Sequence, residues 1–236
     1  MLIRVFDVET TGFPTEEDPQ ALVQVGFCDL HYSAGEAVVG LGGQMFVNPG
    51  RPIPPEVSAI HHITDSDVTG APPPDVGCHF IASGNDTGPA DCYAAFNLDF
   101  DKQFFGGGGL PMFCIYKAAL RVYPDAPSHS NQALRYWLKL PVELERTVPT
   151  HYAGPDAYVS ALILADILNN GFATIDDMTR WSKGAALLPR INFGKHRGKK
   201  WDDAPIDYLQ WIADKSDLDR DTKANARHWL KQRGAA

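Results

Sequence analysis

The hydrophobic pattern of the first part of the chain predicts strands. Residues 2–8 are apolar on both faces of a two-residue period, which is typical of a central strand that is covered on both sides. Residues 21–30 predict a second strand, and residues 38–47 predict a third that is weakened by glycine. Residues 90–96 predict a short strand that leads into the run 96–105.

Proline and glycine separate these strands. They mark residues 48–55 and 70–77 as loops. Residues 106–109 are four glycines, and no Lys-Ser or Lys-Thr pair follows them, as a phosphate-binding loop requires. We therefore expect a flexible connector at this position.

The second half of the chain predicts helices. Residues 111–122 and 130–138 have helical patterns, and either Ser128 or Ser130 is suited to be the N-cap of the second one. A short helix is expected near 174–182.

Gly154-Pro155-Asp156 predicts the start of the strongest helix. Proline at the first helical position and an acid in the first turn are favoured at helix starts. The helix is expected to reach about Leu168 and to stop at the Asn-Asn-Gly of residues 169–171.

The C-terminal region differs from the rest in charge. It predicts a hairpin-like segment at 193–201 and helices from Pro205 and from about Asp219. From Lys183 onward the chain has 12 Lys/Arg and 7 Asp/Glu, whereas residues 1–182 have 9 and 22, within an overall net charge of −8. A basic tail on an acidic body indicates that the two parts meet different partners.

Composition excludes several protein classes. The 236 residues are 44% hydrophobic and 21% charged, which is ordinary for a globular protein and argues against a disordered chain. The longest apolar segment, 158–168, is too short to span a bilayer, and the first residues lack the form of a secretory signal. Cys28, Cys78, Cys92 and Cys114 form no C-x-x-C pair and are expected to be free thiols. We therefore expect a soluble, cytoplasmic protein without membrane contact.

Acidic residues end the first predicted strand. Asp7 and Glu9 are two residues apart, so both side chains lie on one face of the strand. Two partly buried carboxylates repel each other unless a cation compensates them, and hard carboxylate oxygens suit Mg²⁺ or Mn²⁺. Taken alone, this short pattern favours the simpler interpretation that both side chains point to solvent.

Two further segments offer polar chemistry. Asp99 and Asp101 alternate in the segment 97–101, although most Asp residues in such turns are caps. His151 lies five residues before Asp156, which is fixed at a helix start, so both can address one site. Histidine is well suited to accept a proton near neutral pH.

Together the three segments resemble the DEDDh 3′→5′ exonuclease superfamily. The matching pieces are FDVETTG (6–12), AFNLDFD (95–101) and HYAGPDA (151–157). Residues 59–64 also resemble the segment near the substrate cleft of that family, and residues 127–138 resemble the helix before the last motif. The fold that this resemblance implies is α/β: a ribonuclease-H-like mixed central sheet flanked by helices.

The resemblance also implies the catalytic residues. They would be four metal-binding acids and a general base, namely Asp7, Glu9, Asp101, Asp156 and His151. The acids would hold two Mg²⁺ or Mn²⁺ ions, with Asp7 bridging them, Glu9 and Asp156 on one side and Asp101 on the other. Asp101 is preferred because Asp99 is out of register with the N-x-x-F-D pattern of the family.

The choice of base has an alternative within the superfamily. In the DEDDy branch a tyrosine four residues before the last acid has this role, and Tyr152 has that spacing to Asp156. His151 is preferred because its unperturbed pKa is near neutrality, whereas the pKa of tyrosine is about 10. The surrounding H-x-A-x-x-D-A pattern also matches the histidine branch.

The C-terminal segment narrows the resemblance. Residues 191–212 are similar to the C-terminal module of exodeoxyribonuclease X-like proteins. Two features depart from the family: Phe96 stands where histidine is frequent, and the glycine run 106–109 is unusual. Both leave the substrate preference open.

Two groups of residues are candidates for nucleic-acid binding. Backbone N–H groups of Thr10, Thr11, Gly12 and Phe13 are suited to hold a 3′-terminal nucleotide, and the Phe13 ring to stack on a base. For Phe13, a simple strand-to-loop turn is an equally good explanation.

A basic cluster is the second group. Its lysines and arginine are Lys195, Arg197, Lys199 and Lys200. The aromatic residues Phe193 and Trp201 flank them. Phosphate contacts combined with aromatic stacking suit single strands.

We expect three parts in the chain: a DEDDh exonuclease domain at 1–172, a helical linker at 173–190 and a basic nucleic-acid-binding module at 191–236. The predicted function is metal-dependent 3′→5′ hydrolysis of DNA, at single strands or 3′ ends, to nucleoside 5′-monophosphates. The alternatives are an RNA exonuclease and a catalytically silent nucleic-acid-binding adaptor. Protein partners are not indicated by the sequence.

Overall fold

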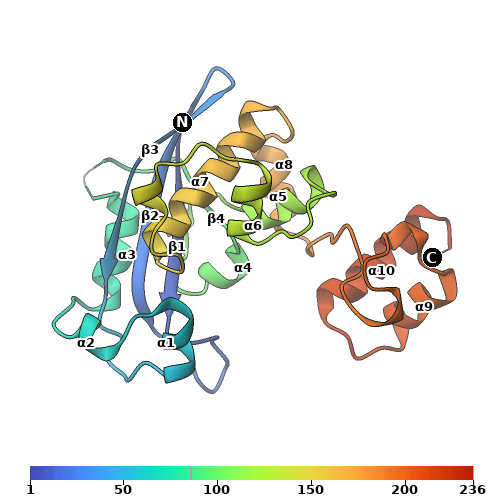
Figure 1. Cartoon of the computed structure of the whole chain (residues 1–236), viewed down its shortest axis with the longest axis horizontal. Coiled ribbons are helices and arrows are strands. Elements are labelled where there is room, and N and C mark those ends of the chain that lie inside the picture. The colour runs from blue at the N-terminus through green and yellow to red at the C-terminus, as the bar shows by residue number, and fades with distance from the viewer. Residues whose placement is uncertain (86, 236) are drawn as a thin grey trace.

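A five-stranded mixed sheet is the centre of the protein (Figure 1). The structure is a computed structural model that describes residues 1–85 and 87–235. The strand order is β3-β2-β1-β4-β5; β1 pairs antiparallel with β2 and parallel with β4. The strands are β1 (Leu2–Thr10), β2 (Leu22–Ser33), β3 (Glu36–Phe46), β4 (Cys92–Ala95) and β5 (Met112–Cys114).

Helices cover both faces of this sheet. In Figure 1, α7 crosses one face while α3 lies on the opposite side of the strands. The helices of the described residues are α1 (Pro55–His61), α2 (Asp65–Val68), α3 (Pro74–Ser83), α4 (Leu98–Asp101), α5 (Ile115–Val122), α6 (Asn131–Trp137), α7 (Ala153–Asn169), α8 (Ile175–Ser182), α9 (Ile206–Asp214) and α10 (Arg220–Gln232). None of these helices is long and apolar enough to cross a membrane.

Side chains of β1 point alternately to the two faces of the sheet and so contribute to two separate hydrophobic cores. Ile3 and Val5 pack in the core that contains the buried residues of α7. Phe6 and Val8 point the other way and pack in the core that contains Phe80 of α3. The expectation that residues 2–8 form a central strand covered on both sides is therefore confirmed.

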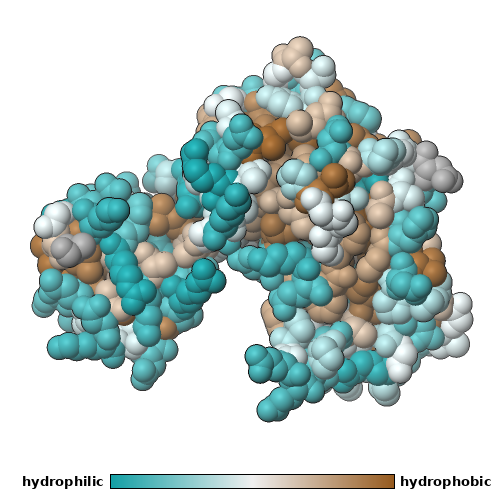
Figure 2. All heavy atoms as spheres, turned by 180° about the vertical axis from the view of Figure 1, so that it is seen from behind, coloured by the Kyte–Doolittle hydropathy of each residue, from teal (hydrophilic) through white to brown (hydrophobic). Residues whose placement is uncertain are grey.

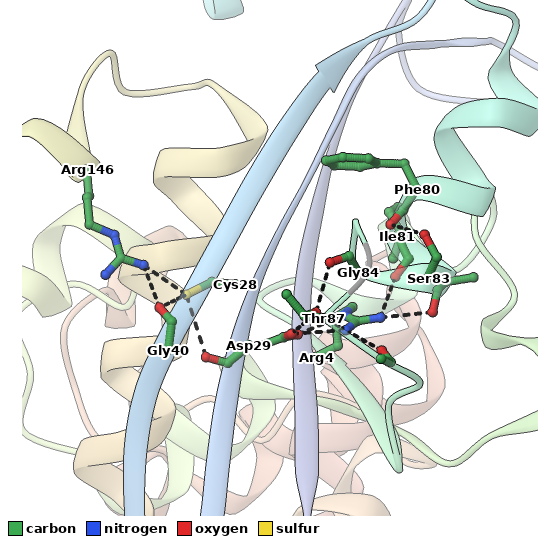
Figure 3. Close-up of polar contacts among 12 residues, drawn as sticks. Arg4, Cys28, Asp29, Gly40, Phe80, Ile81, Ser83, Gly84, Thr87 and Arg146 are labelled. Atoms are coloured by element: carbon green, nitrogen blue, oxygen red, sulfur yellow. Dashed lines mark hydrogen bonds and ion pairs between the residues drawn. The ribbon is translucent and has the colours of Figure 1, made fainter.

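A buried ion pair joins the sheet to the end of α3 (Figure 3). Arg4 Nε and Nη2 donate to the two carboxylate oxygens of Asp29 at 2.7 and 2.9 Å. Arg4 Nη1 donates to the carbonyl of Ile81 at 3.0 Å, so the same guanidinium also binds the last turns of the helix. A Cβ on Gly84, which has a φ of 64°, would collide with this guanidinium. This cluster fixes α3 against the two central strands.

Several predicted boundaries shift in the structure. The expected helix 111–122 begins with strand β5, and only Ile115–Val122 is helical. The glycine run contains a short 3₁₀ turn at Gly107–Gly109. Pro155 is the third residue of α7 rather than the first, because the helix begins at Ala153. Of the two possible N-caps, Ser130 has this role, since its side chain accepts a hydrogen bond from the Ala133 N–H.

Part of the region expected to be loop is helical. α1 and α3 begin at Pro55 and Pro74, within the stretches 48–55 and 70–77. Proline is compatible with the first helical position, where its missing N–H has no intrahelical partner to lose.

The C-terminal helices α9 and α10 lie side by side at one end of the molecule (Figure 1), and they enclose a small hydrophobic cluster of their own. Trp201 is fully buried in it, together with Ile191, Leu209 and Leu230. The suggestion that Trp201 flanks the basic cluster as a stacking surface is therefore wrong. The segment expected to be hairpin-like, 193–201, has two short 3₁₀ turns instead of strands, and one antiparallel bridge joins its Lys200 to Arg190, just before the segment.

Candidate active site

Asp7 and Glu9 extend the inner face of β1. They continue the odd-numbered positions of Ile3 and Val5, which face the core that contains α7. Both carboxyl side chains are half-buried rather than free in solvent. The same alternation that makes β1 a central strand therefore directs these two acids toward α7.

The first turn of α7 brings Asp156 to the same place. Gly26 on β2 lies opposite Asp7, and a Cβ on Gly26 would collide with the backbone of Ala153 and Gly154. The Ala153 N–H donates to Gln24 Oε1 at 2.8 Å, which satisfies one of the free donors at the helix start. Glycine on the strand thus permits a close approach that sets the position of the helix.

Asp7, Glu9 and Asp156 form a possible cation site. Each offers one carboxylate oxygen, and these three oxygens lie within 4.8 Å of one another. They come from two elements that are far apart in the chain, and the fold brings them together.

Asp101 joins the three acids from the parallel neighbour of β1. Because β1 and β4 are parallel, their carboxyl ends meet at one edge of the sheet, and α4 follows β4 directly. Asp101 is buried, and its charge raises the pKa of Asp7. Asp99 instead faces Lys102 and Lys117, whose ammonium groups lie 2.5 and 2.6 Å from its carboxylate oxygens. Asp99 is thus engaged by two lysines, whereas Asp101 is close enough to Asp7 and Glu9 for its charge to raise their pKa values, although it is not one of the three acids whose oxygens lie within 4.8 Å of one another.

Burial raises the pKa values of all four acids, and repulsion by neighbouring carboxylates raises those of Asp7 and Glu9 further. Burial is the largest cause for Asp7, followed by the charges of Asp101, Glu9 and Asp156, and its pKa lies well above the usual range. Burial and the charges of Asp156 and Asp101 raise the pKa of Glu9 to about 8. Burial raises the pKa of Asp101 to about 7. A divalent cation would relieve this repulsion, and carboxylate oxygens are the donors that Mg²⁺ and Mn²⁺ prefer, so the four acids fit such a group.

The side chain of His151 lies beside the last acid, whereas Tyr152 contacts that acid through its backbone carbonyl, which accepts the Asp156 N–H at 3.0 Å. His151 Nδ1 is 4.0 Å from Asp156 Oδ2, and the imidazole is 57% exposed. Its backbone has a φ of 59°, a left-handed conformation that is uncommon for a residue other than glycine. The Tyr152 ring packs edge-on against Phe46 at 6.0 Å, within a separate hydrophobic cluster. Of the two candidate bases, the histidine thus presents its side chain to an acid, and the tyrosine packs its ring against Phe46.

Three side chains of α6 support Asp156, two directly and one through Gln132, and none was predicted as a site residue. Gln132 Nε2 donates to Asp156 Oδ1 at 3.2 Å, and Arg135 Nη1 donates to Gln132 Oε1 at 3.1 Å. Asn131 Nδ2 donates to the Asp156 carbonyl at 3.1 Å. The sequence signal for them was the segment 127–138, which was identified as a helix near the last motif without any single residue being selected.

The segment after Glu9 is partly occupied by its own hydrogen bonds. The Thr11 N–H donates to the Ala21 carbonyl at 2.8 Å, and the Gly12 N–H donates to Thr10 Oγ1 at 3.3 Å. Phe13 is 77% exposed, and its ring lies 5.3 Å from that of Phe100. Two of the backbone donors that were expected to hold a nucleotide thus have partners within the fold, and Phe13 is the freely presented group.

A buried histidine ties α1 to the end of β1. The Ile63 N–H donates to His61 Nδ1 at 3.0 Å, so Nε2 carries the proton that His61 shares with the Thr10 carbonyl at 3.3 Å. This contact places the segment 59–64 next to the acids.

The basic cluster lies in the C-terminal part of the protein. Lys195, Arg197, Lys199 and Lys200 are all exposed there. Figure 2 shows a hydrophilic surface on this part and an open notch between it and the larger body. A cleft of about 770 Å³ between the two parts is lined by Asn97 and Tyr116 on one side and by Arg197 on the other.

The comparisons with known proteins agree with this geometry. No family model matches the chain. The chain is 30% identical over 235 residues to exodeoxyribonuclease 10 of Escherichia coli K12, covering 98% of this chain and 99% of that protein. It is 34% identical over 151 residues to a DNA polymerase III subunit epsilon-like protein of Rhodobacter capsulatus, which covers 61% of this chain and 21% of that protein.

Solved exonuclease structures share the fold. A structure of exonuclease X in complex with 5′ overhanging duplex DNA has a TM-score of 0.62 and 27% identity, covering 76% of this chain and 99% of that one. The E. coli exonuclease I–single-stranded DNA complex has a TM-score of 0.57 at 14% identity, covering 74% and 42%, and is similar in fold alone. The mixed sheet flanked by helices is thus the ribonuclease-H-like exonuclease fold that the sequence predicted. With 30% identity along nearly the whole of both chains, this protein belongs to the exodeoxyribonuclease 10 family of the DEDDh 3′→5′ exonuclease superfamily.

Proposed function

We propose that this exodeoxyribonuclease removes nucleoside 5′-monophosphates from the 3′ ends of DNA in a reaction that needs two divalent metal ions. The observation that carries the proposal is the convergence of four acids with raised pKa values at one edge of the sheet. Repelling buried carboxylates are costly for stability unless a bound cation compensates them.

The acids would divide the two ions between them. Asp7 lies among the other three acids, and each of them contributes to its raised pKa, which favours Asp7 as the ligand shared by both ions. Glu9 and Asp156 would complete one site and Asp101 the other. When bound, two such ions supply an activated water and neutralise charge on the leaving oxygen.

His151 would act as the general base. It is exposed beside Asp156, so its imidazole is free to meet the water that attacks the phosphodiester. Gln132 would hold one oxygen of Asp156 in place, which leaves the other oxygen for the site. Tyr152, packed against Phe46, would have no part in proton transfer.

The three-part division of the chain belongs to the same proposal. Residues 1–172 would carry the acids, 173–190 would connect, and 191–236 would bind nucleic acid through Lys195 and its basic neighbours. The helix of the connecting segment packs on the first part, since Met178 is buried in the core beneath α7. Among the described residues, the cluster around Trp201 is separate from that core.

DNA is favoured over RNA by family membership and by the known partners of similar proteins. The relative is called an exodeoxyribonuclease, and exonuclease X and exonuclease I were solved with DNA. The test uses DNA and RNA oligonucleotides of matched sequence, each incubated with Mg²⁺ and with EDTA. We expect rapid Mg²⁺-dependent shortening of DNA and at most slow shortening of RNA. Faster RNA hydrolysis would favour the RNA exonuclease, and no hydrolysis of either would favour the silent adaptor.

A further inference from the structure

An aromatic pair, formed by the partly buried Tyr208 and the exposed Trp211, lies beside the basic cluster of the C-terminal part. Tyr208 and Trp211 are three residues apart on α9, with ring centroids 5.8 Å apart and an interplanar angle of 21°. Trp211 is 45% exposed. Leu209 and Ile212 of the same helix are fully buried in the hydrophobic cluster. Tyr208 also packs against this cluster, whereas Trp211, among the described residues, is not part of it.

Lys195 places a positive charge over this pair. Its Nζ lies 5.7 Å from the centroid of the Tyr208 ring. Lys195 belongs to the short turn Gly194–His196, which passes close to Tyr208, since a Cβ on Gly194 would stand 3.2 Å from the Tyr208 hydroxyl. On the same turn, His196 is 9% exposed and its ring centroid lies 4.5 Å from that of Tyr208. The aromatic pair is thus supported from the side of the basic turn.

These groups line one hollow. It has a volume of about 420 Å³ and is lined by Lys195, His196, Pro205, Asp207, Tyr208 and Trp211. The acid among them, Asp207, accepts a hydrogen bond from the Tyr208 N–H at 2.9 Å at the start of α9. The hollow therefore combines flat aromatic faces, a cation at its edge and room for a planar group.

We propose that this hollow binds an unpaired base of single-stranded DNA, stacked on Trp211, with the neighbouring phosphate at Lys195. Exposed aromatic rings beside cations match the alternation of bases and phosphates along a single strand. The bases of a duplex are stacked on each other and do not present a free face, so the occupant is an unpaired nucleotide. This inference rests on the proposed function, because it takes the C-terminal part as the DNA-binding part of the exonuclease.

The test measures binding of the full-length protein to two oligonucleotides, with Ca²⁺ in place of Mg²⁺ to prevent cleavage. One is a 12-nucleotide oligothymidylate, and the other has the same backbone with abasic positions in place of the bases. We expect Trp211→Ala to weaken oligothymidylate binding about 5- to 100-fold, the range for loss of one base–aromatic stack. Binding of the abasic strand should change less than about twofold, because phosphate contacts remain. Trp211→Phe should restore most of the affinity.

A matched control is available elsewhere in the chain. Trp137 on α6 is 41% exposed and packs edge-on against Tyr123 at 5.9 Å, and Trp137→Ala should bind both strands like the wild type. If Trp211→Ala weakened binding of both oligonucleotides equally, Trp211 would have a structural role and the proposal would be overturned. Unchanged binding of both oligonucleotides by this variant would also overturn it.

Failure of the base-binding proposal can be distinguished from failure of the proposed exonuclease function. Hydrolysis by the wild type in Mg²⁺ is measured separately. If it is absent while Trp211→Ala still removes the preference for bases over abasic positions, the binding site stands and the proposed exonuclease function falls.

Discussion

Gly26 lies directly opposite Asp7 in the antiparallel pairing of β1 and β2, and a side chain on it would strike the first residues of α7. Asp156 is on the first turn of that helix. The distance between Asp7 and Asp156 therefore depends on the absence of a side chain at Gly26. The site is therefore built by close packing of backbone as much as by its carboxylates.

We predict that Gly26→Ala displaces the start of α7. Overpacking of this kind lowers the free energy of unfolding by about 1–3 kcal/mol. A displacement of about 1 Å at the site is expected to lower turnover by about 10²-fold. The measurements are denaturant unfolding, turnover and Mn²⁺ binding. Gly106→Ala is the control, because a Cβ there meets open space, and it should retain turnover. Equal behaviour of the two variants would contradict this explanation.

Substitutions of Asp99 and Asp101 test which of these two residues belongs to the acidic site. Asp101→Asn should lower turnover and Mg²⁺ affinity severely, because this buried carboxylate lies among the other acids. Asp99→Asn should lower turnover far less, since its carboxylate is engaged by Lys102 and Lys117. Steady-state kinetics with a Mg²⁺ titration decides between them. A greater loss with Asp99→Asn would exchange their roles.

The general base is tested in the same way. His151→Ala should lower turnover by about 10²–10⁴-fold, the usual range for loss of a general base. It should leave metal affinity nearly unchanged, because the histidine is not proposed as a ligand. Tyr152→Phe should be mild, since the ring contact with Phe46 is retained. If the tyrosine variant were the more damaged of the two, the protein would belong mechanistically to the DEDDy branch.

The stability of the metal-free protein should fall as the pH rises. Glu9 and Asp101 have pKa values raised to about 8 and about 7. Between pH 4.5 and 8 the folded state therefore binds more protons than the unfolded state, so their contribution to stability is present at low pH and is lost as these groups ionise. Melting temperatures in EDTA from pH 5.5 to 8.5 measure this. Glu9→Gln should flatten the decrease, and an equally steep decrease in that variant would contradict the pKa assignment.

Sequence patterns predicted the parts of the site that depend on local periodicity. The alternation along residues 2–8 is a local property, and it correctly placed Asp7 and Glu9 on one face of β1. The interpretation that the short pattern alone favoured, with both side chains pointing to solvent, is wrong, because both are half-buried. The start of α7 near Asp156 was also signalled locally, by proline and an acid in the first turn. The short helices α1 and α3 were missed because they begin at prolines within stretches that also contain loop residues.

Tertiary packing decided what local patterns left open. Gln132 contacts Asp156 across two helices, and no spacing in the chain indicates that contact. Trp201 and Trp211 are both aromatic residues near the basic cluster, yet the first is fully buried and the second is exposed. Only the assembled hydrophobic cluster distinguishes a core tryptophan from one that is free to stack.

The direction and the chemistry of hydrolysis are tested together by one experiment. A single-stranded DNA labelled at its 5′ end is incubated with Mg²⁺, and the products of wild type and Asp7→Asn are separated over time. We predict that the wild type gives a ladder of 5′-labelled fragments that shorten stepwise from the 3′ end, and that Asp7→Asn stays folded but gives no ladder. Immediate release of the label as a mononucleotide, or a normal ladder from Asp7→Asn, would contradict the assignment of this site.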